Sequence, residues 1–123
     1  MKIQESAENY LEAILMIQRE KGICRSIDVA HFLEFSKPSV SRAMGLLREN
    51  GYVVMDENGL LTLTESGQEI ASRIFERHQL LTEWLTNLGV APDVAQADAC
   101  RIEHVISEET FTKIKGHIAT YFV

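Results

Sequence analysis

The stretch SKPSVSRAMGLLRENG, residues 36–51, limits what this chain can fold into more than any other feature. Ser36 can cap a helix, Pro38 falls in the first turn where a missing N–H costs little, and Gly51 provides a C-terminal stop. Apolar residues recur along one face only, which leaves the charged and hydroxyl side chains facing outward. We therefore predict a short, half-exposed helix.

The hydrophobic period changes directly after this helix. YVVMDENGLLTLT offers two short strands, 52–55 and 60–63, around the turn DENG. Asn58 and Gly59 are predicted to provide the positive φ values that a tight hairpin needs. A helix followed at once by a hairpin is typical of the end of a winged helix-turn-helix domain.

The flanking segments complete a mainly α fold. A first helix is predicted over 6–20, with Ser6 as its N-cap and Gly22 as its stop, and a second, short helix after a cap at Ser26. Three further helices are predicted at about 65–87 (after a Thr64 cap), 93–106 and 108–122. We expect an N-terminal winged helix-turn-helix with a two-stranded wing over 1–64, followed by a C-terminal helical domain over 65–123.

The charge distribution favours nucleic acid as a partner of the first domain. The chain carries a net charge of −6, yet residues 19–48 hold six basic against three acidic residues, a local net charge of +3. In a winged helix-turn-helix, the second, exposed helix enters the major groove of DNA. Its basic and hydroxyl side chains can reach phosphates and base edges. The predicted DNA-binding residues are Ser36, Lys37, Pro38, Ser39, Ser41, Arg42 and Arg48.

Two alternatives limit this interpretation. The basic segment can be ordinary surface scatter, and a winged helix can bind a protein instead of DNA. The predicted hairpin tip, residues 57–59, is acidic, so we do not expect a strong phosphate clamp from the wing. No apolar run approaches the roughly 20 residues of a membrane span, and the N-terminus resembles no secretory signal, so we predict a cytoplasmic protein without a membrane partner.

The stretch ACRIEHVIS, residues 99–107, is the strongest sign of a metal centre. Its cysteine, glutamate and histidine, Cys100, Glu103 and His104, fall on one face of a helix. Thiolate, carboxylate and imidazole groups gathered on one face would repel or desolvate one another without a cation. Three polar residues that merely share a helix face are the plainer alternative.

The segments SAENYLEAI, SVSRAMGLLRENGYV, LTLTESGQEIA, ERHQLLTEWL and ACRIEHVIS resemble, in this order, the diphtheria toxin repressor family of metal-dependent transcriptional repressors. The resemblance runs from about residue 5 to the end. It implies a cytoplasmic homodimer that binds Fe²⁺ or Mn²⁺, then binds operator DNA and represses metal-uptake genes. The second domain would then be the metal-binding and dimerisation domain. Without an SH3-like domain, the chain is similar to the shorter, manganese-transport-regulator branch.

By resemblance, the metal ligands are Asn9, Glu12, His78, Cys100, Glu103 and His104. The set is a hybrid, since the manganese branch has aspartate and glutamate where Asn9 and Cys100 stand, and the iron branch has methionine and cysteine. A thiolate favours softer ions, so Cys100 shifts the expectation towards Fe²⁺, with Mn²⁺ second. Zn²⁺ or Co²⁺ is also expected to bind in vitro. The second site of the iron branch is not expected, because Thr82 and Gln96 stand where its ligands would be.

Two functions from other classes remain open at this point. One is a metal-independent winged-helix regulator that senses a small apolar ligand, or a thiol oxidant through Cys100. The other is a metallohydrolase with an open coordination position. The sequence suggests no separate acid–base group for hydrolysis, so we do not expect an enzyme.

Overall fold

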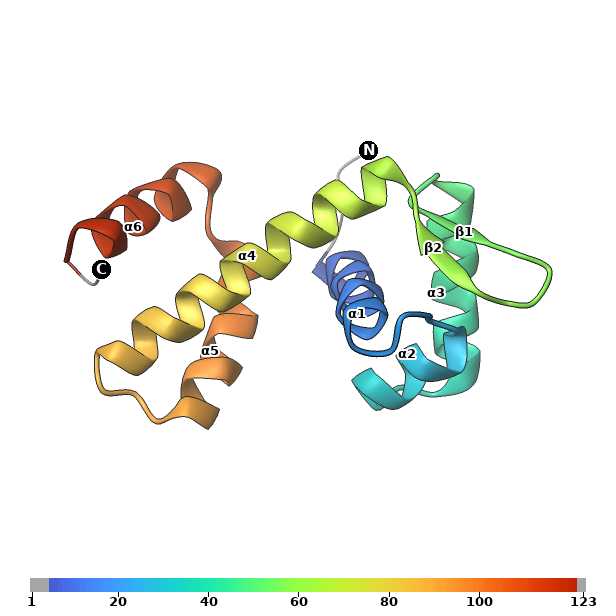
Figure 1. The fold of residues 1–123 in the computed structure, drawn as a ribbon, viewed down its shortest axis with the longest axis horizontal. Coiled ribbons are helices and arrows are strands. Elements are labelled where there is room, and N and C mark those ends of the chain that lie inside the picture. Colours follow the sequence, from blue (N-terminus) through green and yellow to red (C-terminus); the bar gives the residue numbers. More distant parts are fainter. Residues whose placement is uncertain (1–4, 122–123) are drawn as a thin grey trace. The chain divides into compact units, whose positions relative to one another are not determined.

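The computed structural model describes residues 5–121, and the fold is mainly α, as predicted (Figure 1). The elements are α1 (Glu5–Lys21), α2 (Ser26–Leu33), α3 (Lys37–Glu49), β1 (Val53–Met55), β2 (Leu61–Leu63), α4 (Glu65–Asn87), α5 (Pro92–Val105) and α6 (Glu108–Tyr121). The predicted end of the last helix, residue 122, lies outside the described residues. None of the helices in residues 5–121 combines the length and the apolar character that a membrane crossing requires.

The chain divides into two compact units, one up to Ser72 and the other from Arg73 onward. The first unit is a winged helix-turn-helix. Helices α1, α2 and α3 pack on one another, and the antiparallel pair β1–β2 forms the wing, with Val53 opposite Leu63. The core contains apolar side chains from all of these elements: Leu11, Ile14, Val29, Val40, Met44, Leu47, Val53 and Leu61.

Most of the predicted helix ends are correct, but two predicted caps are wrong. Ser6 lies inside α1 and does not precede it. Ser26 is the first residue of α2, and Arg25 is the N-cap. There the carboxylate of Asp28, three residues on, accepts a 2.9 Å hydrogen bond from the Arg25 N–H, so the cap uses an acidic side chain from inside the first turn.

The wing turn also differs from the prediction. Gly59 has a positive φ of 80°, whereas Asn58 is not among the positive-φ residues of the described chain. The turn is closed by Asp56, whose Oδ1 accepts 2.9 Å hydrogen bonds from the N–H groups of Asn58 and Leu60. The side chain of Asp56 therefore stabilises this turn through hydrogen bonds, without a second positive-φ residue.

The start of α4 is fixed to the segment between α3 and β1. Thr64 caps the helix as predicted, since its Oγ1 accepts a 3.2 Å hydrogen bond from the Gly67 N–H. The same hydroxyl donates a 2.6 Å hydrogen bond to the Gly51 carbonyl. A Cβ atom at Gly67 would collide with the carbonyl oxygen of Tyr52, so only glycine allows this close approach.

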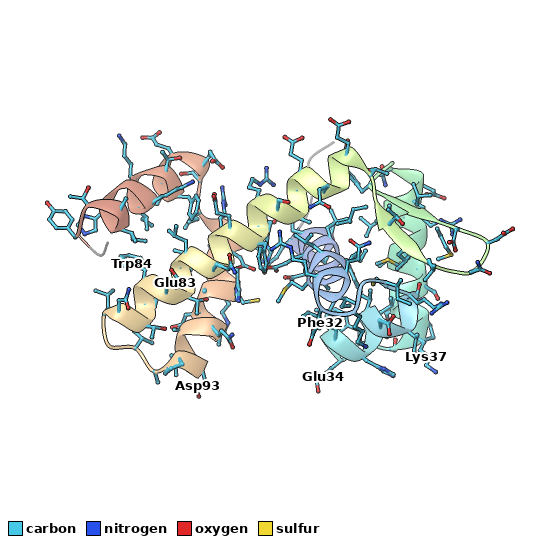
Figure 2. The ribbon with its side chains drawn as sticks, viewed as in Figure 1. Phe32, Glu34, Lys37, Glu83, Trp84 and Asp93 are labelled. Atoms are coloured by element: carbon cyan, nitrogen blue, oxygen red, sulfur yellow. The ribbon has the colours of Figure 1, made fainter. Side chains whose placement is uncertain are left out.

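The second unit has its own small core. Leu81, Ala99 and Phe111, from α4, α5 and α6, are buried together. Partly buried apolar side chains pack around them: Leu80, Trp84, Ile102, Ile106 and Ile114. Trp84, labelled on α4 in Figure 2, is the only tryptophan of the chain. This core holds α5 and α6 against the second half of α4, which carries His78.

Candidate DNA-binding surface and metal centre

Helix α3 presents the predicted DNA-binding side chains to solvent. Val40, Met44 and Leu47 are buried on its inner face. Ser36 caps the helix as predicted, since its Oγ accepts a 3.3 Å hydrogen bond from the Ser39 N–H. The outer face is exposed at every predicted position: Ser36, Lys37, Pro38, Ser39, Ser41, Arg42 and Arg48. This arrangement suits a helix that inserts into a groove.

The N-terminal ends of α2 and α3 lie close together. Ser26 and Ile27 of α2 and Lys37 and Ser41 of α3 line one small pocket. Lys37, labelled in Figure 2, belongs to the first turn of α3. Two helix N-termini, an ammonium group and hydroxyl groups on one surface provide donors for phosphate oxygens.

The wing is fastened to the turn between α1 and α2. The Leu61 N–H donates a 2.8 Å hydrogen bond to the Cys24 carbonyl, and Gln18 Nε2 donates a 3.1 Å bond to the Leu61 carbonyl. At the tip, Arg25 Nε donates a 3.4 Å hydrogen bond to the Asn58 carbonyl. Arg25 thus places a cation beside the acidic tip, a feature that the sequence analysis did not identify.

Three potential metal ligands converge on α5. Cys100, Glu103 and His104 each offer a donor atom, and these atoms lie within 4.8 Å of one another. Glu103 has no exposed surface, whereas Cys100 is exposed. His104 Nε2 lies 3.4 Å from Glu103 Oε1. The structure therefore brings the three side chains together, as their spacing along the helix predicted.

Helix α4 brings a further imidazole to Glu103. His78 Nδ1 lies 2.9 Å from Glu103 Oε2, and the His78 side chain is largely buried. One turn further along α4, the buried Oγ1 of Thr82 makes no hydrogen bond within residues 5–121. Gln96 is exposed on α5. Thr82 and Gln96 thus offer neither a carboxylate nor an imidazole for a second ion.

The other two predicted ligands belong to the first unit. Asn9 and Glu12 are three residues apart on α1 and so share a face of that helix. Asn9 is half-buried and Glu12 is buried. Within the second unit, Cys100, Glu103 and His104 form one cluster, and His78 contacts its glutamate.

The donor groups of the second unit fit a divalent cation. Ligand atoms lie about 2.0–2.3 Å from a first-row metal ion, so donors within 4.8 Å of one another can share one ion. Oε1 of Glu103 is buried and makes no hydrogen bond within residues 5–121. A buried carboxylate oxygen without a hydrogen bond is costly, and a cation would satisfy it.

Arg77 is a residue of this region that the sequence analysis missed. Its side chain is buried on α4, next to His78 in sequence, and it reaches α5 and α6. Arginine is seldom buried, so the sequence gave no reason to place Arg77 in the interior. The acidic start of α6, Glu108, was the one available signal, since a buried guanidinium needs an anion.

The second cysteine, Cys24, is a buried residue of the first unit. Burial raises the pKa of the Cys24 thiol from 9.0 to about 12, with a further contribution from the charge of Asp28. A thiol with so high a pKa is a poor nucleophile at neutral pH.

Comparisons with known proteins agree with this two-part organisation. The family model "Iron dependent repressor, N-terminal DNA binding domain" matches residues 2–61. The model "Iron dependent repressor, metal binding and dimerisation domain" matches residues 64–120. The matches follow one another along nearly the whole chain.

Individual relatives lead to the same family. The HTH-type transcriptional regulator MntR of Shouchella clausii is 36% identical over 117 residues, which cover 95% of this chain and 81% of that protein. The transcriptional regulator MntR of an Escherichia coli O6:H1 strain is 36% identical over 107 residues, covering 87% and 69%. A solved manganese-dependent transcriptional repressor in complex with manganese superposes with a TM-score of 0.83 at 30% identity, covering 92% of this chain and 52% of that one. The match thus spans about half the length of the chain in that solved structure.

Proposed function

Because the chain belongs to the iron-dependent repressor family, we propose that it is a metal-dependent transcriptional repressor. Loaded with Fe²⁺ or Mn²⁺, it binds operator DNA and represses genes for metal uptake. This family consists of transcriptional regulators and not of enzymes. We assign DNA binding to residues 1–64 and metal binding and dimerisation to residues 65–123.

The single observation that carries this function is the buried carboxylate of Glu103. It meets an imidazole on one side, at 2.9 Å from His78 Nδ1, and a second imidazole on the other, at 3.4 Å from His104 Nε2. The thiol of Cys100 belongs to the same cluster. A metal-independent regulator has no need of this donor set beside a buried carboxylate, so the cluster favours the metal-dependent function.

We assign six metal ligands: Asn9, Glu12, His78, Cys100, Glu103 and His104. Cys100 is the ligand that bears most on metal choice, since a thiolate raises affinity along the Irving–Williams order. We expect Fe²⁺ to bind more tightly than Mn²⁺, and Zn²⁺ and Co²⁺ to bind in vitro. A solved relative at 30% identity is a manganese-dependent repressor, which keeps Mn²⁺ as the second candidate.

The ligand set suggests how metal binding controls DNA binding. When bound, a divalent cation supplies positive charge that carboxylates and imidazoles from both units can share. Asn9 and Glu12 are carried by α1, which packs on α2 and α3. His78, Glu103 and His104 are carried by α4 and α5. Joining the two sets would restrict the orientation of α3 and so favour the spacing at which two recognition helices meet successive major grooves, about 34 Å apart.

This mechanism requires a homodimer, and the helical unit is the part that we assign to the dimer interface. Large apolar side chains are exposed on it: Leu88 at 56%, Val94 at 47% and Val105 at 73%. Exposed large apolar side chains are typical of surfaces that bind a partner. Binding to operator DNA would place the protein in the cytoplasm.

The test is DNA binding by the wild-type chain and two variants. DNA is first selected from a random duplex library with the Mn²⁺-loaded protein. Binding is then titrated separately with Fe²⁺ under anaerobic conditions, Mn²⁺ and Zn²⁺, with a chelator control. Glu103→Gln should abolish the metal response, while Glu109→Gln, an exposed change on α6, should preserve it. Equal DNA binding with metal and with chelator would refute the proposed function.

A further inference from the structure

Arg77, the residue before His78 on α4, is buried and contacts both α5 and α6. Only 6% of it is exposed. Nη1 donates hydrogen bonds to the carbonyl oxygens of Glu103, at 3.0 Å, and Ile106, at 3.1 Å. Nη2 lies 2.7 Å from Oε2 of Glu108, and the guanidinium carbon lies 5.1 Å from the centre of the Phe111 ring. One side chain of α4 thus reaches the end of α5 and the start of α6.

The two carbonyl groups lie at the C-terminal end of α5, that of Glu103 in its last turn and that of Ile106 at its C-cap. The helix ends at Val105, so its last carbonyl oxygens have no N–H partner within the helix. They also carry the partial negative charge of the helix C-terminus, which a cation stabilises. Nη1 binds both oxygens while Nη2 meets Glu108, and a lysine ammonium cannot reproduce this planar arrangement of two donor nitrogens.

Consecutive residues of α4 therefore hold the same residue of α5 from two directions. Arg77 binds the backbone carbonyl of Glu103, and His78 contacts its carboxylate at 2.9 Å. Together they fix both the position and the rotation of the last turn of α5 against α4. His104 is the next residue of that turn, so its imidazole is placed by the same contacts.

Resting on the proposed function, we propose that Arg77 is a positioning residue, which holds the end of α5 so that Glu103 and His104 meet His78 before the ion arrives. Its charge is compensated by Glu108, and it does not compete for the cation as a ligand. Groups that orient metal ligands typically contribute 10–100-fold to metal affinity. Preorganisation of this kind lowers the cost of ordering the ligands on binding.

The test compares the Mn²⁺ affinity of full-length variants, measured at 10 °C by fluorescence of Trp84, which packs on the core of this unit. Arg77→Met removes every polar contact, and Arg77→Lys keeps only the charge. We expect both to weaken Mn²⁺ binding by about 10–100-fold. Glu109→Gln, an exposed change on α6, should retain wild-type affinity.

A stability-matched control separates positioning from general destabilisation. Ile114→Ala removes a partly buried side chain that packs on the core of the same unit, and should lower Tm while leaving the Mn²⁺ affinity unchanged. The visible absorption of bound Co²⁺ should change in the Arg77 variants and not in Ile114→Ala. If Arg77→Met does not fold, Arg77→Lys is compared with Ile114→Ala in the same way.

The outcomes distinguish the two proposals. Wild-type protein that binds neither Mn²⁺ nor Co²⁺ would refute the proposed function. Wild-type binding together with unchanged affinity and an unchanged Co²⁺ spectrum in Arg77→Lys or Arg77→Met would refute the role of Arg77 alone. A loss of affinity equal to that of Ile114→Ala would also refute it.

Discussion

Replacing Glu103 by glutamine should change the stability of the protein in opposite directions with and without metal. The carboxylate has no exposed surface, and Oε1 makes no hydrogen bond within residues 5–121. Leaving a buried polar atom unsatisfied costs roughly 1–3 kcal/mol, and more where the group is charged. Glutamine keeps an oxygen for His78, and its amide nitrogen takes the place of Oε1 without the charge. The metal-free variant should therefore be more stable than wild type by up to about that amount, or several degrees in Tm.

In the presence of metal, wild type should be more stable than Glu103→Gln. An ion that binds only the folded state at 100 times its Kd stabilises by about 2.7 kcal/mol. Wild-type protein should gain this stabilisation in Mn²⁺, and Glu103→Gln should gain almost none, because a neutral amide is a poor substitute for a carboxylate ligand. Thus Glu103→Gln is more stable than wild type in chelator and less stable in excess Mn²⁺.

The assay is thermal unfolding followed by circular dichroism, in chelator and in a series of Mn²⁺ concentrations. Glu109→Gln, an exposed change on the neighbouring helix, should follow the wild type in both conditions. A Glu103→Gln protein that is less stable than wild type in chelator would show that the buried carboxylate is stabilising on its own. A full Mn²⁺ response in that variant would show that Glu103 is not a ligand.

Four further predictions concern other parts of the chain. Gly67→Ala should destabilise the protein by about 1–3 kcal/mol because the new methyl group meets a backbone carbonyl, whereas Gly116→Ala, in open space on α6, should stabilise it by roughly 0.5–1 kcal/mol in denaturant melts. Iodoacetamide at pH 8 should label exposed Cys100, with protection by Mn²⁺, and spare buried Cys24; labelling of Cys24 in the native protein would contradict its pKa of about 12. Since that pKa is raised from 9.0, stability should fall as pH rises from 9 to 12, and Cys24→Ala should remove this slope. Arg42→Ala should weaken DNA binding and lower the salt slope by about 1, and an unchanged slope would remove Arg42 from the interface.

Sequence patterns predicted the elements because each element follows local rules. The apolar period, Ser36 before the recognition helix and Thr64 before α4 all determine structure within one or two turns. Helical spacing likewise placed Cys100 and His104 on one face. These features need no knowledge of what packs on the helix.

Features that depend on competition between neighbours were not predictable in the same way. Ser26 has the side chain of a good N-cap, but Asp28 satisfies the backbone of Arg25 and the helix begins one residue earlier than that cap implies. The wing turn uses Asp56 where a positive φ was expected at Asn58. Arg77 depends on three helices at once, so no local pattern signals its burial.

The most direct test of the central claim is to measure the Kd for Mn²⁺ with and without saturating selected DNA, beside the Kd for DNA with and without Mn²⁺. If metal binding orients the DNA-binding unit, the two affinities must change by the same factor, because coupling between two sites is reciprocal. We predict a common factor of at least 10. A Kd for Mn²⁺ that DNA leaves unchanged would contradict the account.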